Sequence, residues 1–157
     1  MTKGVSPTIF TQIIRGESPA RFIWSDDECV AFLTIEPRMP GHTLVVPRDE
    51  VDRWTDLDES LVLHLMAVAH RIGLAQREEW GADRAGLMLE GYMVPHMHIH
   101  VWPSWSPWEF HPAGIERHPD PADLDDAAVR LRSRLRARGF GERVPAEPGR
   151  ALPEHAQ

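Results

Sequence analysis

Apolar residues recur along the chain in short blocks, and the spacing within each block predicts a helix or a strand. In block 6–16 a capping sequence precedes apolar residues at helical spacing and a glycine ends the block, which predicts a short helix. Three strands are predicted by the next apolar runs, at 21–25, 29–35 and 42–47. The pair Asp26-Asp27 between the first two runs is typical of a hairpin turn.

A longer block at 58–80 has apolar residues at helical spacing and is followed by Gly81, so it predicts the longest helix of the chain. Runs at 85–90 and 96–102 predict two further strands. The short links between strands favour an antiparallel sheet with its helices on one side, which is an α+β fold.

The pattern changes after Pro103, where tryptophans and prolines indicate an irregular segment to about residue 118. Asp120 and Pro121 then provide a strong helix start, and Gly139 ends the helix. A narrow apolar stripe runs along this helix at Leu124, Ala128, Leu131 and Leu135. We expect the stripe to dock on the domain, and the helix to affect stability or assembly more than chemistry.

The end of the chain is rich in proline, glutamate and glycine, a composition typical of disorder. We therefore divide the chain into a domain at 1–118, a C-terminal helix at 119–140 and a disordered tail at 141–157.

Composition and charge narrow the possible partners. The 157 residues are 42% hydrophobic and 26% charged, as in an ordinary globular domain, and the formal net charge is -7. Dense basic sequence occurs only at 130–138, so long nucleic acid is not an expected partner. The start of the chain lacks the apolar stretch of a signal peptide, and no run reaches the roughly 20 residues of a membrane span, so we expect a cytoplasmic protein without a membrane partner. The single cysteine, Cys29, lies in an apolar run and is expected to be buried.

Three histidines at alternate positions stand out in segment 96–102: His96, His98 and His100. Successive strand residues point to opposite faces, so the three imidazoles are expected on one face and the intervening apolar residues on the other. Alternate residues are about 6.6 Å apart, so the outer two histidines lie roughly 13 Å apart and all three cannot touch one atom. His98 is therefore best placed to meet a reacting centre, and a neutral imidazole can act there as a nucleophile.

The segment resembles the defining motif of the histidine triad (HIT) superfamily of nucleotide hydrolases and transferases, in which hydrophobic residues separate three histidines. Further blocks that resemble this family occur in order between residues 8 and 105, among them Thr8-Ile9-Phe10 and Pro40-Gly41-His42. The resemblance implies a five-stranded antiparallel sheet with two helices, usually paired as a homodimer.

The resemblance also implies roles for individual residues. His98 matches the nucleophile that forms a nucleotidylated imidazole, which water or another acceptor resolves. His100 and His42 match the histidines that contact the phosphate, and His96 matches the one that supports the site from behind. The family lines its base and ribose pocket at the positions of Phe10, Ile13, Phe32, Leu33, Thr34 and Ile35.

Two departures from the family concern the substrate. Many members carry aspartate, which binds the ribose hydroxyls, at the position of Thr34. A glutamine and a hydroxyl residue usually precede the triad, where this chain has Tyr92 and Met93. The identity of the nucleotide is therefore left open.

A third departure concerns metal. Several bacterial members have a structural zinc site built from two cysteines and histidines, and here Thr8, Thr11 and Glu50 stand at three of those positions. Threonine cannot replace a thiolate ligand to zinc, so we expect neither a structural zinc nor another cofactor.

The leading hypothesis is a hydrolase that acts at the α-phosphate of a nucleoside phosphoramidate or a dinucleoside polyphosphate. A nucleotidyltransferase or phosphorylase, a nucleotide-binding module without turnover and a metal-binding protein remain as alternatives.

Overall fold

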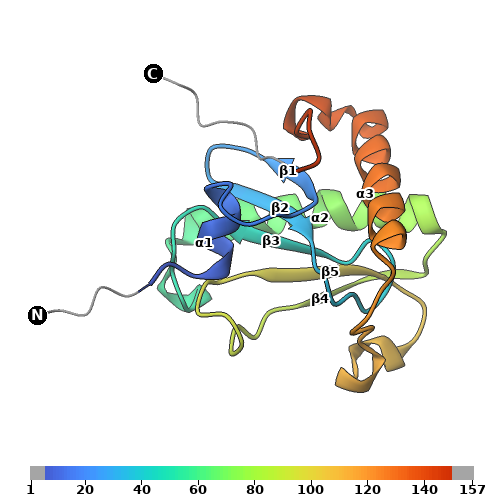
Figure 1. The fold of residues 1–157 in the computed structure, drawn as a ribbon, viewed down its shortest axis with the longest axis horizontal. Helices are drawn as coiled ribbons and strands as arrows, with labels where there is room; N and C mark the ends of the chain where they lie inside the picture. Colours follow the sequence, from blue (N-terminus) through green and yellow to red (C-terminus); the bar gives the residue numbers. More distant parts are fainter. Residues whose placement is uncertain (1–5, 150–157) are drawn as a thin grey trace, which may run out of the picture.

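A five-stranded antiparallel sheet forms the centre of the computed structural model, which describes residues 6–149 (Figure 1). The spatial order of the strands is β1-β2-β3-β5-β4. Their bounds are β1 (Phe22–Ser25), β2 (Cys29–Leu33), β3 (Thr43–Pro47), β4 (Arg84–Met88) and β5 (Ile99–Ser104). The predicted α+β fold with five antiparallel strands is confirmed.

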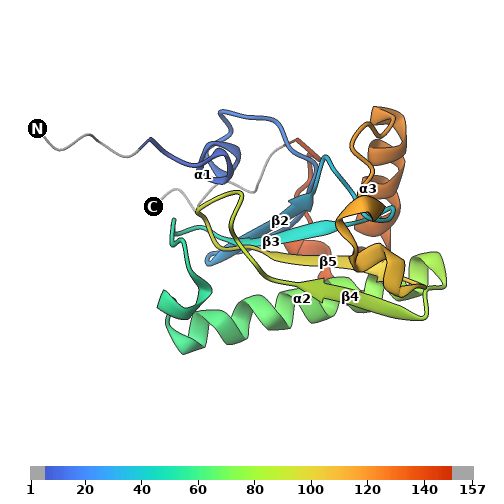
Figure 2. The same cartoon turned by 90° about the horizontal axis from the view of Figure 1, so that it is seen from below.

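Helices cover both faces of this sheet, so the expectation that they lie on one side is wrong. The helices are α1 (Ile9–Ile14), α2 (Glu59–Trp80) and α3 (Pro121–Leu135). Figure 2 shows the sheet edge-on, with α1 on one side and α2 on the other. None of the helices in residues 6–149 is long and apolar enough to cross a membrane.

Strand β2 shows why both faces need a cover. Cys29, Ala31 and Leu33 pack in one apolar cluster with residues of α2, while Val30 and Phe32 pack in a second cluster with residues of α1. All five residues are buried. A strand that is apolar on both faces destabilises the fold unless each face is shielded from water.

Helix α3 docks on the same apolar cluster as α2, through three residues of the stripe predicted from the sequence, Ala128, Leu131 and Leu135. The four residues of the stripe, Leu124, Ala128, Leu131 and Leu135, are all buried. A five-residue π-helical turn, Arg136–Phe140, follows the helix, and Gly139 adopts a positive φ of 93° within it. The extension therefore completes the core of the domain.

The segment after this turn is ordered as far as the structure describes it, which corrects the expectation of a disordered tail. Gly141–Arg143 form a short 3-10 helix, and Val144 is buried in the core next to it. The remaining part of the predicted tail, 150–157, lies outside the described residues.

Hydrogen bonds to a buried arginine hold this segment despite its polar composition. The guanidinium of Arg132 donates to the carbonyl oxygens of Phe22, at 2.6 Å, and of Pro145. The N–H of Phe22 donates to the carbonyl of Pro148 at 2.8 Å. Composition could not reveal these bonds, because their partners are up to 126 positions apart in the sequence.

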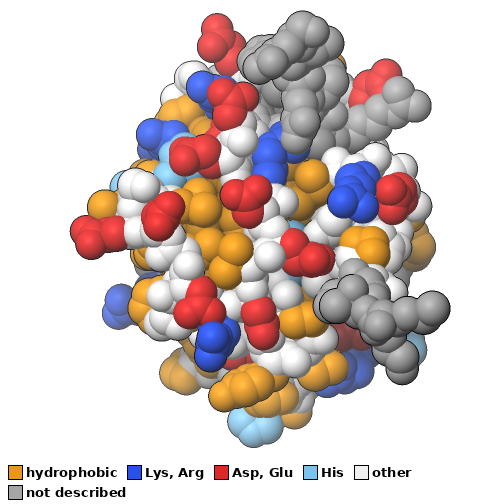
Figure 3. Space-filling model, turned by 90° about the vertical axis from the view of Figure 1, so that its left-hand side faces the viewer, with side chains coloured by type: hydrophobic (Ala, Val, Ile, Leu, Met, Phe, Trp, Pro, Cys, Tyr) orange, Lys and Arg blue, Asp and Glu red, His pale blue; other side chains and the backbone are white. Residues whose placement is uncertain are grey.

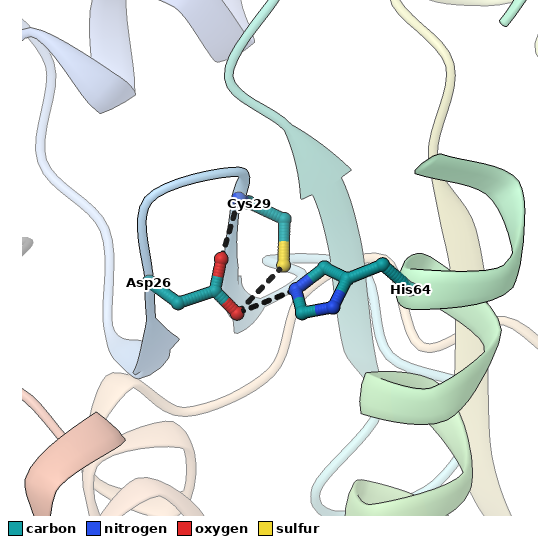
Figure 4. A group of neighbouring side chains, drawn as sticks. All are labelled: Asp26, Cys29 and His64. Atoms are coloured by element: carbon teal, nitrogen blue, oxygen red, sulfur yellow. Dashed lines mark hydrogen bonds and ion pairs between the residues drawn. The ribbon is translucent and has the colours of Figure 1, made fainter. Parts of the chain in front are cut away.

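The β1–β2 hairpin is tied to α2 through Asp26 (Figure 4). One oxygen of its carboxylate accepts hydrogen bonds from Trp24 Nε1 at 2.7 Å, His64 Nε2 at 2.8 Å and the Cys29 thiol at 3.5 Å. The other oxygen accepts from the backbone N–H groups of Glu28 and Cys29, each at 2.9 Å. Burial by itself raises the pKa of Asp26, but these hydrogen bonds outweigh it and lower the pKa from 3.8 to about 2.

Replacing Asp26 with asparagine should lower the free energy of unfolding by about 2 kcal/mol at neutral pH, which corresponds to the shift in its pKa. The pKa is depressed in the folded state, so this contribution is present above pH 3.8 and is lost as the pH falls toward about 2. Urea unfolding at pH 7 and at about pH 3 measures both effects. The exposed neighbour Asp27 provides the control substitution, and equal losses from Asp26→Asn and Asp27→Asn would contradict the assignment.

Candidate active site

The three histidines of segment 96–102 lie where β5 begins. The predicted strand covered 96–102, whereas β5 starts at Ile99, so His96 and His98 precede the ladder and only His100 lies within it. The backbone pairing with β3 ends at Val45 and Ile99. Two positions farther along β3 stands Pro47, which has no N–H to donate and whose carbonyl is occupied by the side chain of His96.

The imidazoles nevertheless share one side of the sheet. The residues that alternate with them, Met97, Ile99 and Val101, pack in the α2 cluster on the opposite side. The Phe10 ring of α1 contacts the His98 ring edge-on, with 4.9 Å between the ring centroids. The His98 and His100 rings are also 4.9 Å apart.

His42 is brought to this group from the loop before β3. Gly41 precedes it with a φ of 84°, a conformation that favours glycine, and its α-carbon faces the ring of Trp80 too closely for a side chain. Leu44 pairs with His100 across the β3–β5 ladder, which places His42 at the end of the same face. The structure thus brings together the four histidines that the sequence singled out.

A chain of hydrogen bonds determines which nitrogen carries the proton in two of these rings. The backbone N–H of Arg38 donates to His42 Nδ1 at 3.0 Å, so in the neutral ring the proton is on Nε2. His42 Nε2 lies 2.9 Å from His100 Nδ1 and donates to it. The proton of neutral His100 is therefore on Nε2, where it can be donated to a ligand.

The neighbouring ring has the opposite arrangement. His98 Nδ1 lies 2.8 Å from the carbonyl oxygen of His96 and can only donate to it. Nε2 of neutral His98 therefore has no proton and carries a lone pair. The site thus places an unprotonated ring nitrogen on His98 next to an N–H donor on the adjacent His100.

Burial keeps these rings neutral. It lowers the pKa of His42, His98 and His100 below the ordinary value of 6.5, because a charged imidazole loses its hydration inside the protein. For His100 the pKa falls to about 4, with repulsion from His98 and Arg38 adding to the effect of burial. All three imidazoles are uncharged at neutral pH, which agrees with the proton positions given above.

Arg38 is a part of the site that the sequence did not reveal. Its guanidinium donates to the carbonyl oxygens of Glu109 at 2.8 Å and His111 at 3.2 Å, and lies over the Trp102 ring. This places a fixed positive charge beside the histidines, where an anionic ligand is favoured. An arginine in a loop is usually solvated, so only the tertiary structure identifies this one.

His96 supports the group from a fully buried position. Its Nε2 donates to the carbonyl oxygen of Pro47 at 2.8 Å, and its Nδ1 accepts from the hydroxyl of Thr8 at 2.9 Å. Both ring nitrogens are thus occupied, and the His96 carbonyl orients His98. The geometry gives this residue an orienting role.

Thr8, Thr11 and Glu50 lie beside His96 at the positions where the family resemblance implies a zinc site. A carboxylate oxygen of Glu50 accepts from the backbone N–H of Thr8 at 2.6 Å and from the hydroxyl of Thr11 at 2.9 Å. Neutral hydroxyls in place of thiolates do not fit a structural zinc. Hydrogen bonds link here the elements that a metal would otherwise join.

Asp26, Cys29 and His64 also bring ligand-type atoms within 4.8 Å of one another, as Figure 4 shows. The Asp26 carboxylate already accepts five hydrogen bonds, and burial raises the pKa of the Cys29 thiol, which keeps it protonated. We interpret this group as the hydrogen-bonded anchor of the hairpin.

A cavity of about 680 Å³, a volume within the usual range for small-molecule sites, lies beside α1, and its lining residues include Phe10 but none of the histidines. Its lining includes all six residues expected in a nucleoside pocket, namely Phe10, Ile13, Phe32, Leu33, Thr34 and Ile35. Two lining residues contact the histidines: the Phe10 ring packs against the His98 ring, and Leu44 pairs with His100 in the β3–β5 ladder. Tyr92 and Met93, in contrast, are exposed in the loop before the triad, at 91% and 87%.

Comparison with known proteins identifies one family. The HIT domain matches residues 15–106 of the chain. An uncharacterized HIT-like protein of Saccharolobus solfataricus is 33% identical over 103 residues, which cover 62% of this chain and 74% of that protein.

Solved structures show the same similarity. A zinc-bound histidine triad family protein from Mycobacterium smegmatis superposes with a TM-score of 0.73 at 29% identity, covering 85% of this chain and 96% of the other. A HIT family hydrolase from Legionella pneumophila gives a TM-score of 0.55 at 25% identity, covering 64% and 95%.

Nuclear magnetic resonance titration should show that His98 titrates below pH 6.5 and His100 near pH 4, because burial lowers both pKa values. In the urea-unfolded chain, the control, the histidine signals should titrate near the unperturbed pKa of about 6.5. Since the unfolded chain then binds protons that the folded site excludes, stability should fall as the pH drops below about 6.5. Titration of either ring at or above pH 6.5 in the folded protein would contradict the neutral arrangement.

Proposed function

The chain belongs to the HIT domain family, and from that premise we propose that it hydrolyses nucleotides at the α-phosphate through a nucleotidyl-histidine intermediate on His98. The observation that carries the proposal is the unprotonated Nε2 of His98 beside the Nε2–H donor of His100. Nucleoside phosphoramidates and dinucleoside polyphosphates are the proposed substrates, because both carry a leaving group on the α-phosphorus.

In the first step the His98 Nε2 lone pair attacks the α-phosphorus. A P–N bond to His98 forms while the bond between phosphorus and the leaving nitrogen or oxygen breaks. His100 Nε2–H donates a hydrogen bond to the phosphoryl oxygens, and the Arg38 charge favours the negative charge that develops there. The leaving group takes the proton that it needs from solvent water, while neutral His100 keeps its Nε2–H on the phosphoryl oxygens.

In the second step water attacks the same phosphorus and displaces His98. The P–N bond breaks, its electron pair returns to Nε2, and a nucleoside monophosphate is released. The attacking water releases a proton to solvent, which replaces the one taken up by the leaving group, so the site returns to its starting state. Throughout the cycle the bond from His98 Nδ1 to the His96 carbonyl stabilises the ring while it carries positive charge.

The cavity beside the histidines suits the nucleoside part of such a substrate. Its lining is largely apolar, and Phe10, which is part of that lining, also contacts the His98 ring. A flat base can pack among Phe10, Ile13 and Phe32, while the attached phosphate reaches His98.

The partner in this proposal is a small molecule and not long nucleic acid. On the face shown in Figure 3, acidic side chains are dispersed among apolar ones, and the basic side chains form no continuous stripe. A duplex needs clustered cations to release its counterions, whereas one phosphate needs only a few local donors.

Replacing His98 with alanine should reduce turnover at least about 10³-fold, more than the loss of one phosphate-orienting hydrogen bond, which costs roughly 10²–10³-fold. Nucleotide affinity should remain close to that of the native protein, because the cavity and the flanking donors are retained. His42→Ala and His100→Ala should therefore be less severe.

Single-turnover kinetics with a nucleotide labelled on the α-phosphate, followed by detection of label on the protein, test this order. The substrate panel includes phosphoramidates and dinucleoside polyphosphates, each with and without inorganic phosphate as an alternative acceptor. If His98→Ala turns over within about tenfold of the native rate, the nucleophile assignment is wrong.

We also propose that the protein is a homodimer that pairs through the edge strand β4. This strand is last in the sheet order and leaves Leu87 43% exposed, and an exposed apolar edge favours pairing with another chain.

Analytical ultracentrifugation should give a dimer for the native chain and a monomer for Leu87→Lys. Val129→Lys, at an exposed apolar position on α3, is the matched control and should remain dimeric. A native monomer at micromolar concentration would contradict pairing through β4.

A further inference from the structure

The lining of the cavity extends beyond both ends of the segment that matches the HIT domain, since Phe10 and Ile13 precede residue 15. The match ends at residue 106, whereas one wall of the cavity is formed by Asp125, Pro148 and Gly149. Asp125 is on the docked helix α3, and the other two residues belong to the segment that follows the helix. The opposite side of the same cavity contains Phe10 and Ile13 of α1.

Two groups of hydrogen bonds keep this wall in place. The buried Arg132 joins the carbonyl oxygens of Phe22 and Pro145, so the C-terminal segment runs beside β1. The N–H of Phe22 then donates to the carbonyl of Pro148 at 2.8 Å, which anchors the wall residue itself. Arg132 is only 3% exposed, and its charge is satisfied by backbone carbonyl oxygens, so it fixes the C-terminal segment firmly against β1.

Asp125 gives the wall a specific chemistry. Among the described residues that line the cavity it is the one acidic side chain, and it accepts a hydrogen bond from Arg21 Nε at 2.6 Å. Arg21 also donates to the carbonyl oxygen of Pro121, at the start of α3. A carboxylate has about four acceptor positions, so an ion pair with one arginine leaves it able to accept from a ligand as well.

We propose that the C-terminal extension forms part of the nucleoside-binding site, in which Pro148 and Gly149 cover the nucleoside and Asp125 accepts a hydrogen bond from one of its O–H or N–H groups. The proposal rests on the proposed function and adds the element that selects the substrate. It also replaces the expectation that the extension affects stability more than chemistry.

Truncation tests the covering residues. A chain that ends at Glu147 lacks Pro148 and Gly149, and the matched control ends at Arg150 and keeps both. The probes are adenosine monophosphate, which can use the cavity and the histidines, and inorganic phosphate, which can use the histidines alone. The shorter chain should bind adenosine monophosphate about tenfold more weakly than the control and bind phosphate equally well. With a turnover substrate, KM should rise while kcat is retained.

A single substitution tests the carboxylate. Asp125→Asn should weaken the binding of adenosine monophosphate by about tenfold, because the neutral amide oxygen accepts a hydrogen bond more weakly than the carboxylate. Asp126→Asn is the matched control, since this exposed neighbour on α3 lies near Arg130 and is not part of the cavity lining. The loss should disappear with 2′-deoxyadenosine monophosphate if Asp125 accepts from the ribose, and with inosine monophosphate if it accepts from the base amino group.

The outcomes separate this inference from the proposed function. If the native protein binds adenosine monophosphate while the chain ending at Glu147 and Asp125→Asn both bind it equally well, the extension is not part of the site and the inference is wrong. If the native protein neither binds nor turns over any nucleotide, the proposed function itself fails. Circular dichroism of each variant confirms that it is folded.

Discussion

A sheet that is covered on both faces must divide its side chains between two environments, and the candidate site depends on that division. Along β5 and the residues before it, Met97, Ile99 and Val101 enter the core shared with α2. The intervening imidazoles then necessarily lie on the α1 side, next to Phe10. The small helix α1 closes that side incompletely, so the same face can hold a packed cluster and an open cavity.

The chemistry of the site follows from how its protons are placed. The Arg38 backbone N–H donates to His42, and His42 donates to His100, which leaves the His100 proton on Nε2. The His96 carbonyl instead accepts from Nδ1 of His98 and leaves its Nε2 unprotonated. Two adjacent and chemically identical side chains thereby present a lone pair and an N–H. Burial keeps both rings neutral. Their Nδ1 atoms need hydrogen-bond partners within the protein, because an unsatisfied polar atom in the interior is costly.

Hydrogen bonds made by single polar side chains connect distant segments elsewhere in the chain. Asp26 joins the β1–β2 hairpin to α2, and Arg132 joins α3 and the C-terminal segment to β1. Thr8 joins α1 to His96 at a position where the family resemblance implies zinc. In each place one polar side chain forms hydrogen bonds that link separate elements, and these bonds fix the relative positions of the elements that surround the site.

Features that arise from local periodicity could be predicted from the amino-acid sequence alone. The alternation in 96–102 predicted that the histidines share a face, and the stripe from Leu124 to Leu135 predicted how α3 docks. Segment 58–80 predicted α2 to within one residue. Side-chain direction in helices and strands repeats over a few residues, so the pattern of apolar positions is sufficient for these predictions.

Features that depend on pairs of residues far apart in the chain became visible only in the folded protein. His42 meets His100 across 58 positions and Arg21 meets Asp125 across 104. The proton positions, the charge of Arg38 near the histidines and the order of residues 141–149 all rest on such contacts. A backbone carbonyl or a guanidinium has no signature in the local pattern, because its partner is chosen by the packing of the whole chain.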